Sequence, residues 1–297
     1  MPTTVSRPLL PPTLPFGRAA LPATAARSTF RYKTHTMNFE YFCLTDTGQV
    51  RDNNEDAVAI DADNHIAVLA DGMGGYNAGE VAAEMATTFV TSELGRWIAE
   101  GGSDASGREL RRAMEVCIDN ANRSIFNAAN TNPQYAGMGT TLVMGVFQDA
   151  RILIGHVGDS RCYRLRNGAL VQLTRDHSLL QEQIDAGLLT PKQAQFATHK
   201  NLVTRALGVE DSVLLEVSEY RAEEDDLFLM CSDGLNDMVS DERIAAILVS
   251  TITLAEKSHA LINAANDCGG RDNISVILAQ ARSKPVRRGL LSRMLGQ

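Results

Sequence analysis

Short β-type runs alternate with turn signals from about residue 41 to residue 279, and this alternation restricts the possible folds more than any other feature. Two long stretches with apolar residues at helical spacing, 78–98 and 107–129, interrupt the runs. Shorter helical stretches follow at 241–250 and 254–266. Strands dispersed through a chain, with helices between them, indicate sheets that share one core and carry helices outside.

Turn signals indicate antiparallel pairing between successive strands. Asn167-Gly168 is typical of a tight hairpin, and Asp61–Asn64 separates two short β-type runs. The expected strands cover 41–44, 57–60, 65–70, 140–147, 152–157, 162–166, 170–173, 213–220, 227–231 and 274–279.

The two ends of the sequence differ from its middle. Residues 1–36 are rich in Pro, Ala, Thr and Arg without hydrophobic periodicity, so we expect a disordered basic extension there. A mis-assigned start, a targeting arm and a transit peptide are all compatible with this composition. Residues 282–297 form a basic tail, for which a solvated end and a short amphipathic helix are both open. One globular domain is expected over 37–281.

Charge is distributed unevenly along the chain. The net charge is −8, but 1–36 and 282–297 together hold ten Lys and Arg and no acidic residue. This leaves about −18 for 37–281. Such an acidic body repels nucleic acid, whereas clustered carboxylates suit hard divalent cations.

Cysteine usage and hydropathy bear on the compartment. The five cysteines form no CxxC pair, and an odd number suits a reducing compartment better than a disulfide framework. The sequence holds no run of about eighteen apolar residues and no clean signal-peptide core. We therefore expect a soluble cytoplasmic protein without a membrane span.

A set of aspartates stands where expected strands meet turns, several of them beside glycine. A single Asp-Gly pair is explained by turn chemistry alone. Glycine beside an aspartate also lets the backbone approach a ligand and frees a carbonyl to coordinate it. If the strand ends converge, the set forms one carboxylate cluster, which consists of Asp56, Asp71, Asp159, Asp233 and Asp272.

With its local motifs, this set resembles the bacterial branch of the metal-dependent protein serine/threonine phosphatases of type 2C. The resemblance covers roughly 40–280, and its ordered combination of motifs is more specific than any one of them. The resemblance implies a four-layer α-β-β-α sandwich of the α+β class, with two antiparallel sheets and a metal cleft at one edge between them. The motifs are Arg51–Asp56, Ala70–Gly75, Gly139–Thr141, His156–Arg161, Cys231–Gly234 and Gly270–Asn273.

The resemblance also implies ligands for two Mn²⁺ or Mg²⁺ ions. Asp56, Asp71 and the Gly72 carbonyl would hold the pair, completed by Asp233 and Asp272. Carboxylate and water ligands, without thiolate or imidazole, favour these two metals over zinc or copper. Such a pair would hydrolyse phosphoserine and phosphothreonine through a hydroxide shared by the two ions.

Four further roles follow from the same resemblance. Arg51 would bind the substrate phosphate, since its planar fork donates two hydrogen bonds at once. Glu55 would act on the metals through water, and Asn273 would orient a ligand or a water. Asp159, with Asp233, would bind a third, weaker ion.

The proton donor to the leaving group is unassigned. Some family members have a histidine after the Asp-Gly of the second motif, but this chain has Met73 there. Water at the metals is one alternative. By residue type, the other possible proton donors are histidines, although a structural role is favoured for each of them. They are His65, His156, His177 and His199.

The family also suggests a flap and partners. Residues 178–208 correspond to the variable flap beside the active site, for which a substrate-contacting loop and a passive surface excursion are equally open. Expected partners are phosphoproteins and a cognate bacterial Ser/Thr kinase, and the expected state is a monomer.

Other function classes fit the letters less well. A cysteine phosphatase needs Arg six positions after its Cys, but Asp237 follows Cys231 there. Gly158–Cys162 lacks the final glycine of a serine-hydrolase elbow, and Gly72–Gly75 lacks the Lys of a nucleotide-binding loop. A non-enzymatic phosphoprotein-binding module and a two-metal phosphodiesterase or nuclease stay as alternatives.

Overall fold

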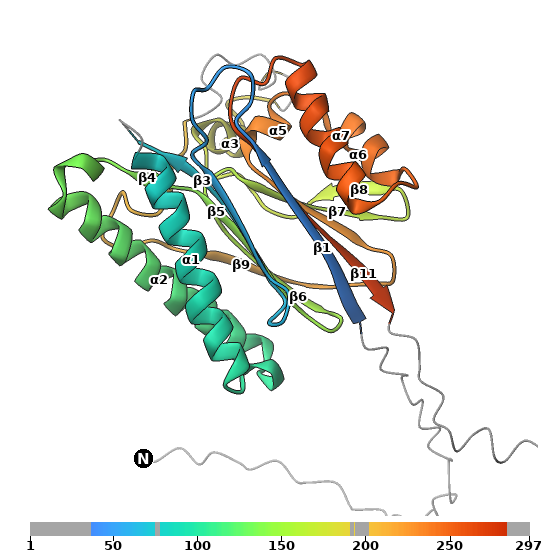
Figure 1. Ribbon diagram of the computed structural model, residues 1–297, viewed down its shortest axis with the longest axis horizontal. Helices are drawn as coiled ribbons and strands as arrows, with labels where there is room; N and C mark the ends of the chain where they lie inside the picture. Colours follow the sequence, from blue (N-terminus) through green and yellow to red (C-terminus); the bar gives the residue numbers. More distant parts are fainter. Residues whose placement is uncertain (1–36, 75–77, 191–192, 194–201, 284–297) are drawn as a thin grey trace, which may run out of the picture. The chain divides into compact units, whose positions relative to one another are not determined.

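Two antiparallel sheets, built from strands distant in the sequence, form the centre of the fold (Figure 1). The computed structural model describes residues 37–74, 78–190, 193 and 202–283. In the first sheet, with order β1-β11-β10-β7-β8, the outer strand β1 pairs with β11 over its full ten residues. Its strands are β1 (Met37–Asp46), β7 (Arg161–Arg166), β8 (Ala169–Gln172), β10 (Leu227–Cys231) and β11 (Ile274–Ser283).

The second sheet has the order β2-β3-β5-β6-β9, and the short strand β4 also pairs with β3. Its hairpin β2–β3 places Asp56 opposite Asp71. The strands are β2 (Asp56–Asp61), β3 (Ile66–Met73), β4 (Gly139–Thr140), β5 (Leu142–Gln148), β6 (Arg151–Val157) and β9 (Glu216–Arg221).

Helices cover the outer face of each sheet (Figure 1). The long helices α1 (Ala78–Ala99) and α2 (Gly107–Thr131) pack on the second sheet, and α6 (Asp241–Val249) and α7 (Leu254–Asp267) pack on the first. The short helices are α3 (Leu179–Asp185), α5 (Asp233–Asn236), η1 (Gly102–Asp104) and η2 (Pro133–Tyr135).

The core separates into three layers because neighbouring strand residues point to opposite faces. Leu69 and Phe228 belong to a cluster that draws on both sheets and lies between them. Val68, next to Leu69, packs instead with α1 and α2, and Leu229, next to Phe228, packs with α6 and α7. Three apolar layers between four layers of elements confirm the predicted α-β-β-α sandwich.

Capping and turn residues mark the ends of several helices and strands. Ser106 and Thr253 form capping boxes at the starts of α2 and α7. Asn167 and Gly168 have φ of 51° and 79°, as a tight hairpin requires. The prediction of one strand over 140–147 was wrong: the ladder with β3 breaks at Thr141, because the Asp71 N–H donates to the Thr141 hydroxyl at 3.2 Å and not to the Thr141 carbonyl.

The predicted domain limits stay predictions. Residues 1–36 and 284–297 lie outside the described residues, and β11 continues two residues past the expected domain end at 281. In the described part of the chain, no helix is both long and apolar enough to cross a membrane.

Candidate metal centre

The centre begins with two aspartates that face each other across the β2–β3 hairpin. Asp56 opens β2 and pairs in register with Asp71 of β3. Directly opposite residues on one face of an antiparallel pair have Cβ atoms about 4.5–5.5 Å apart. The hairpin therefore places two carboxylates at one end of the second sheet.

The first sheet and a crossover between the sheets supply three further carboxylates. Asp233 follows β10 as the first residue of α5, and Asp272 lies two residues before β11. Asp159 lies in the turn between β6 of one sheet and β7 of the other. The structure thus brings together segments that are far apart in the sequence.

The electrostatics of Asp71 show that the five carboxylates share one place. Burial raises the pKa of Asp71 well above its usual range, since a buried carboxylate loses its hydration. Four negative charges raise the pKa of Asp71 further, in decreasing order those of Asp56, Asp233, Asp159 and Asp272. Burial likewise raises the pKa of Asp233, and Asp159 is the charge that raises it most. A cation among these oxygens would relieve their mutual repulsion and favour the ionised form of the cluster.

Asp56 provides a test of whether a hard cation fits. Its Oδ2 accepts a hydrogen bond from the Ser232 hydroxyl at 2.8 Å, and the Ser275 N–H, donating to that hydroxyl at 2.9 Å, fixes its direction. Its Oδ1 is buried and has no hydrogen-bond partner among the described residues. Burial raises the pKa of Asp56 to about 6. A buried carboxylate oxygen without a donor suits a metal ligand, and a set of oxygen donors suits Mg²⁺ or Mn²⁺.

Gly72, whose carbonyl is a ligand by the family resemblance, lies where no side chain fits. A Cβ on Gly72 would lie 2.2 Å from the Gly79 carbonyl oxygen and 2.5 Å from the Glu55 carbonyl oxygen. The Gly72 N–H also donates to that Glu55 oxygen at 3.1 Å. The backbone after Asp71 is thereby held between the start of α1 and the loop before β2.

Threonine side chains fix the Asp71 backbone, a role that the sequence did not reveal. The Asp71 carbonyl accepts hydrogen bonds from the Thr140 hydroxyl and the Thr141 N–H, both at 2.9 Å. The Asp71 N–H donates to Thr141 Oγ1 at 3.2 Å, and that oxygen lies 2.7 Å from Ser160 Oγ. The motif Gly139–Thr141 was the available signal, but it named no partner.

Asn273 holds the loop that carries Arg51 and Glu55. Its Oδ1 accepts from the Glu55 N–H at 2.7 Å, and its Nδ2 donates to the carbonyls of Thr47 and Asn53, both at 2.9 Å. The expected role of Asn273 in orienting a ligand thus has a concrete basis in the backbone. The Glu55 carboxylate lies beside Gly79 in the first turn of α1.

Arg51 lies at the rim. Its Nη2 donates to Asp272 Oδ2 at 2.7 Å, and the two side chains are 51% and 32% exposed. This hydrogen bond raises the pKa of Arg51, so the guanidinium stays charged beside the cluster. The Asp272 contact fixes one nitrogen of the fork and leaves half of the side chain accessible from solvent.

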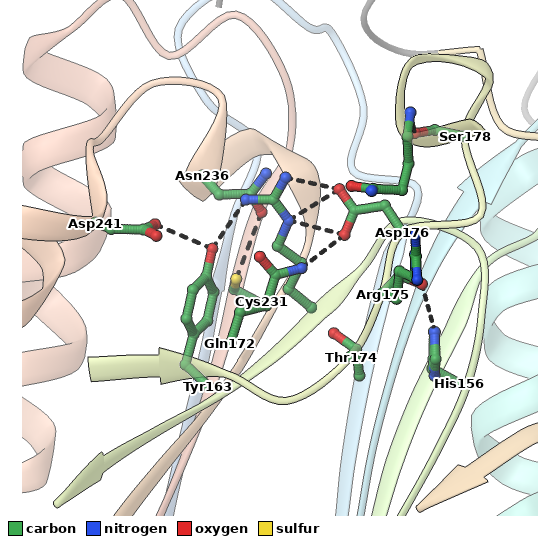
Figure 2. A network of polar contacts seen from close by, with 12 residues as sticks. His156, Tyr163, Gln172, Thr174, Arg175, Asp176, Ser178, Cys231, Asn236 and Asp241 are labelled. Atoms are coloured by element: carbon green, nitrogen blue, oxygen red, sulfur yellow. Dashed lines mark hydrogen bonds and ion pairs between the residues drawn. The ribbon is translucent and has the colours of Figure 1, made fainter. Parts of the chain in front are cut away.

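A charged network around Asp176 (Figure 2) includes Arg161, which lies two residues after Asp159. Nε and Nη2 of Arg161 donate to the Asp176 carboxylate at 2.6–3.0 Å, and Nη1 donates to the Tyr163 hydroxyl at 2.9 Å. The Tyr163 hydroxyl in turn donates to Asp241, at the start of α6. Burial, and after it the Asp176 charge, raises the pKa of Asp159 to about 6.

The histidine candidates have different surroundings. His156 and His177 are buried and hydrogen-bonded, and His65, in the turn between β2 and β3, shares a hydrogen bond of 3.5 Å with the Tyr41 hydroxyl. His199 and Gly75 lie outside the described residues.

Comparison with known proteins identifies the family. The family model described as Protein phosphatase 2C matches residues 47–273. The serine/threonine phosphatase stp of Listeria monocytogenes is 39% identical over 239 residues, which are 80% of this chain and 93% of that protein. The protein phosphatase PhpP of Streptococcus pneumoniae is 38% identical over 242 residues, which are 80% and 96% of the two chains.

Solved structures agree. The catalytic domain of the phosphatase PstP, in complex with two manganese ions, has a TM-score of 0.73 and 36% identity, and the match covers 84% of this chain and all of that one. Stp1 from Staphylococcus aureus has a TM-score of 0.76 and 34% identity, and the match covers 82% and 94%. By sequence and by fold, this chain belongs to the protein phosphatase 2C family.

Proposed function

We propose that this chain is a metal-dependent phosphatase that hydrolyses phosphoserine and phosphothreonine in proteins. The observation that carries the proposal is the convergence of five aspartates from both sheets, with Asp56 Oδ1 buried and unpartnered among the described residues. Membership in the protein phosphatase 2C family supports the same reaction and its dependence on divalent metal.

The chain's residues divide the work. Asp56, Asp71, Asp233, Asp272 and the Gly72 carbonyl would hold two cations, Mn²⁺ or Mg²⁺. When bound, such a pair lowers the pKa of a shared water and neutralises the charge that develops on the phosphoryl oxygens. Arg51 orients the phosphate at the rim with the guanidinium nitrogens that do not contact Asp272.

The remaining ligands and the proton source belong to the proposal too. Glu55 acts through water, and Asp159 with Asp233 binds a third, weaker cation. Asn273 positions the loop that carries Arg51. Met73 has no proton to donate, so the departing serine or threonine oxygen takes its proton from water.

The proposed setting is a cytoplasmic monomer that opposes a bacterial Ser/Thr kinase and acts on that kinase's phosphoprotein substrates. The names of the relatives support phosphoproteins as the substrate class. Segment 178–208, part of which forms α3, is proposed as a flap beside the centre.

Activity on a defined phosphopeptide tests the proposed function. The full chain with Mn²⁺ is expected to release phosphate from a phosphothreonine peptide and from p-nitrophenyl phosphate, and EDTA should abolish the release. A phosphotyrosine peptide is the specificity control. Binding of the phosphopeptide without turnover would favour a non-enzymatic module, and cleavage of a phosphodiester or nucleic acid would favour a nuclease.

Replacing Arg51 by lysine is expected to lower kcat/KM for a phosphothreonine peptide by about 10- to 100-fold. Lysine keeps the charge but loses the bidentate fork, and one charge-assisted hydrogen bond is worth about 1.5–3 kcal/mol. Steady-state kinetics at saturating Mn²⁺ measure the effect. Arg96→Lys, which alters an exposed pair with Glu93 on α1, is the matched control. Equal values for Arg51→Lys and the unmodified chain would remove Arg51 from the phosphate site.

A further inference from the structure

Two histidines that the proposed reaction does not use lie stacked near the Asp159 turn. The ring centroids of His156 and His177 are 4.6 Å apart with an interplanar angle of 16°, and both residues are buried. With Glu216 they offer three ligand atoms within 4.8 Å of one another. Such a set of ligand atoms first suggests a transition-metal site, but the hydrogen bonds of His177 exclude this interpretation.

The proton on His177 can be placed from its partners. The Gly158 N–H, which can only donate, points at His177 Nδ1 at 3.1 Å. Nδ1 must therefore carry a lone pair, and the neutral ring carries its proton on Nε2. Nε2 lies 3.3 Å from Glu216 Oε2, so this proton is directed to a carboxylate. With a proton on Nε2 and an amide on Nδ1, neither nitrogen is free to bind a metal.

The surroundings keep the ring in this neutral form. Burial and then His156 lower the pKa of His177, and the Arg205 guanidinium, 3.4 Å from Nε2, adds to this effect, although Glu216 opposes it. The Arg175 carbonyl can only accept, so His156 carries a proton on Nε2 and donates it to this carbonyl at 2.7 Å, the contact drawn in Figure 2. Each ring of the stacked pair is thus held by hydrogen bonds to its surroundings, and His177 Nδ1 is the acceptor for the Gly158 N–H.

His177 joins the Asp159 turn to both ends of segment 178–208. The backbone N–H of His177 donates to the Gly158 carbonyl at 2.9 Å, so Gly158 is bound to His177 through both its own N–H and its carbonyl. The His177 carbonyl accepts from the Thr204 N–H at 2.8 Å, and the adjacent Ser178 forms an isolated bridge with Val203. One residue therefore connects the turn with the start and the end of this segment.

The turn at Gly158 is closely packed, and it depends on the hydrogen bonds with His177. Gly158 has φ of +105°, and a Cβ there would lie 2.6 Å from the Thr141 side chain. Its buried N–H would lose its acceptor if the His177 ring were removed, and an unpaired buried amide is costly. Asp159 follows directly, and its charge dominates those acting on Asp233. A shift of the turn would therefore change the approach of these two carboxylates.

We propose that His177 is a positioning residue: its Nδ1 fixes the Gly158–Asp159 turn so that Asp159 and Asp233 can share a weakly held cation. The inference rests on the proposed function, in which these aspartates bind the third ion. It assigns His177 no contact with substrate and no proton transfer.

Two substitutions separate the two ring nitrogens. His177→Asn keeps an acceptor near the position of Nδ1, whereas His177→Gln places its amide near Nε2 and leaves the Gly158 N–H without an acceptor. Isothermal titration of the full chain with Mn²⁺ measures the tight and weak binding classes. Asp159→Asn defines the weak class, and His259→Gln, on the exposed face of α7, is the matched control.

We expect His177→Gln to weaken the weak Mn²⁺ class by about tenfold or more and to leave the tight class unchanged, as for a residue that supports a ligand. The Mn²⁺ concentration for half-maximal phosphopeptide hydrolysis should rise in parallel, while kcat at saturating Mn²⁺ is retained. His177→Asn should stay within about threefold of the unmodified chain. A purely structural role would lower the melting temperature of both variants without separating their Mn²⁺ affinities.

Three results would overturn the inference: weak-class affinity unchanged in His177→Gln, an equal loss in both variants, or a weak class that is absent from the unmodified chain or survives Asp159→Asn. If His177→Gln does not fold, loss of the weak class in a folded His177→Asn overturns it, and retention supports it. Failure of the unmodified chain to release phosphate from the phosphothreonine peptide would instead remove the proposed function, so the two failures are distinguishable.

Discussion

Replacing Asp71 by asparagine is expected to lower kcat for a phosphothreonine peptide by about 10³-fold. Asp71 is the carboxylate on which the charges of all four other cluster members act, so its loss removes the ligand nearest the centre of the set. Loss of the charge stabilisation that a correctly held cation provides is worth several kcal/mol, and about 4 kcal/mol corresponds to this factor. The hydroxyl and amide contacts around it hold the Asp71 backbone rather than its carboxylate, so the exchange should leave β3 in place.

The same substitution is expected to stabilise the metal-free protein. The folded-state pKa of Asp71 is raised above its unfolded value, as are those of Asp56 and Asp159, to about 6 each. Groups with raised values favour folding at low pH and lose this contribution as the pH rises through the folded pKa. At pH 7 without metal, the ionised cluster therefore opposes folding. Relief of one such charge is worth about 0.5–2 kcal/mol, or about 1–8 °C for a domain of this size.

Two measurements check both halves of this expectation. Steady-state kinetics at saturating Mn²⁺ give kcat, and thermal unfolding in EDTA and in Mn²⁺ gives the stability. Mn²⁺ at about 100 times its dissociation constant should raise the melting temperature of the unmodified chain by about 5–10 °C, and Asp71→Asn should lose most of this gain. Asp63→Asn, in the exposed turn of the same hairpin, is the control. Near-normal activity with an unchanged Mn²⁺ effect would exclude Asp71 as a ligand.

Local patterns predicted sheets that share one core and carry helices outside, because strands and helices are specified by nearby residues, whereas the four-layer sandwich was implied by the family resemblance. The Asn167-Gly168 turn needs only two residues with positive φ, and the capping boxes of α2 and α7 need only residues three apart. The alternation seen at Val68 and Leu69 assigns each strand two buried faces, which two helix-covered sheets require. The strands and helices therefore followed from signals that are short in range, and their arrangement in four layers followed from the resemblance.

The long-range partners could not be predicted in the same way. The resemblance gave Asn273 an orienting role but no partner, and in the fold it bonds to Glu55, 218 positions away; Ser232 likewise bonds to Asp56 across 176 positions. Thr141 divides an otherwise apolar strand because its hydroxyl, in place of its carbonyl, accepts the hydrogen bond from the Asp71 N–H. A polar side chain near a strand end indicates that it needs a hydrogen-bond partner, but the sequence does not identify that partner. The residues that hold the aspartate cluster are therefore seen only in the folded structure.

Replacing Gly72 by alanine is the second change with a large expected effect. A Cβ there would lie within 2.2–2.5 Å of the carbonyl oxygens of Gly79 and Glu55, and backbone atoms cannot move aside as a flexible side chain can. The clash would push β3 away from α1 at the residue after Asp71. Overpacking of this kind costs about 1–3 kcal/mol, or about 2–12 °C in melting temperature.

We expect Gly72→Ala to lose most of its phosphopeptide hydrolysis as well, because the same displacement moves the Asp71 carboxylate and the Gly72 carbonyl relative to Asp56. Gly74→Ala is the matched control: it lies two residues further on, and its Cβ would meet neighbours at 3.2 Å or more, which a few tenths of an ångström of adjustment can relieve. Thermal unfolding in EDTA isolates the packing cost from the loss of metal, and titration with Mn²⁺ measures the second effect. If Gly72→Ala matched Gly74→Ala in both measurements, the close approach of β3, α1 and the Glu55 loop would not be what places the two ligands, and the centre would have to be held by the carboxylates of the first sheet instead.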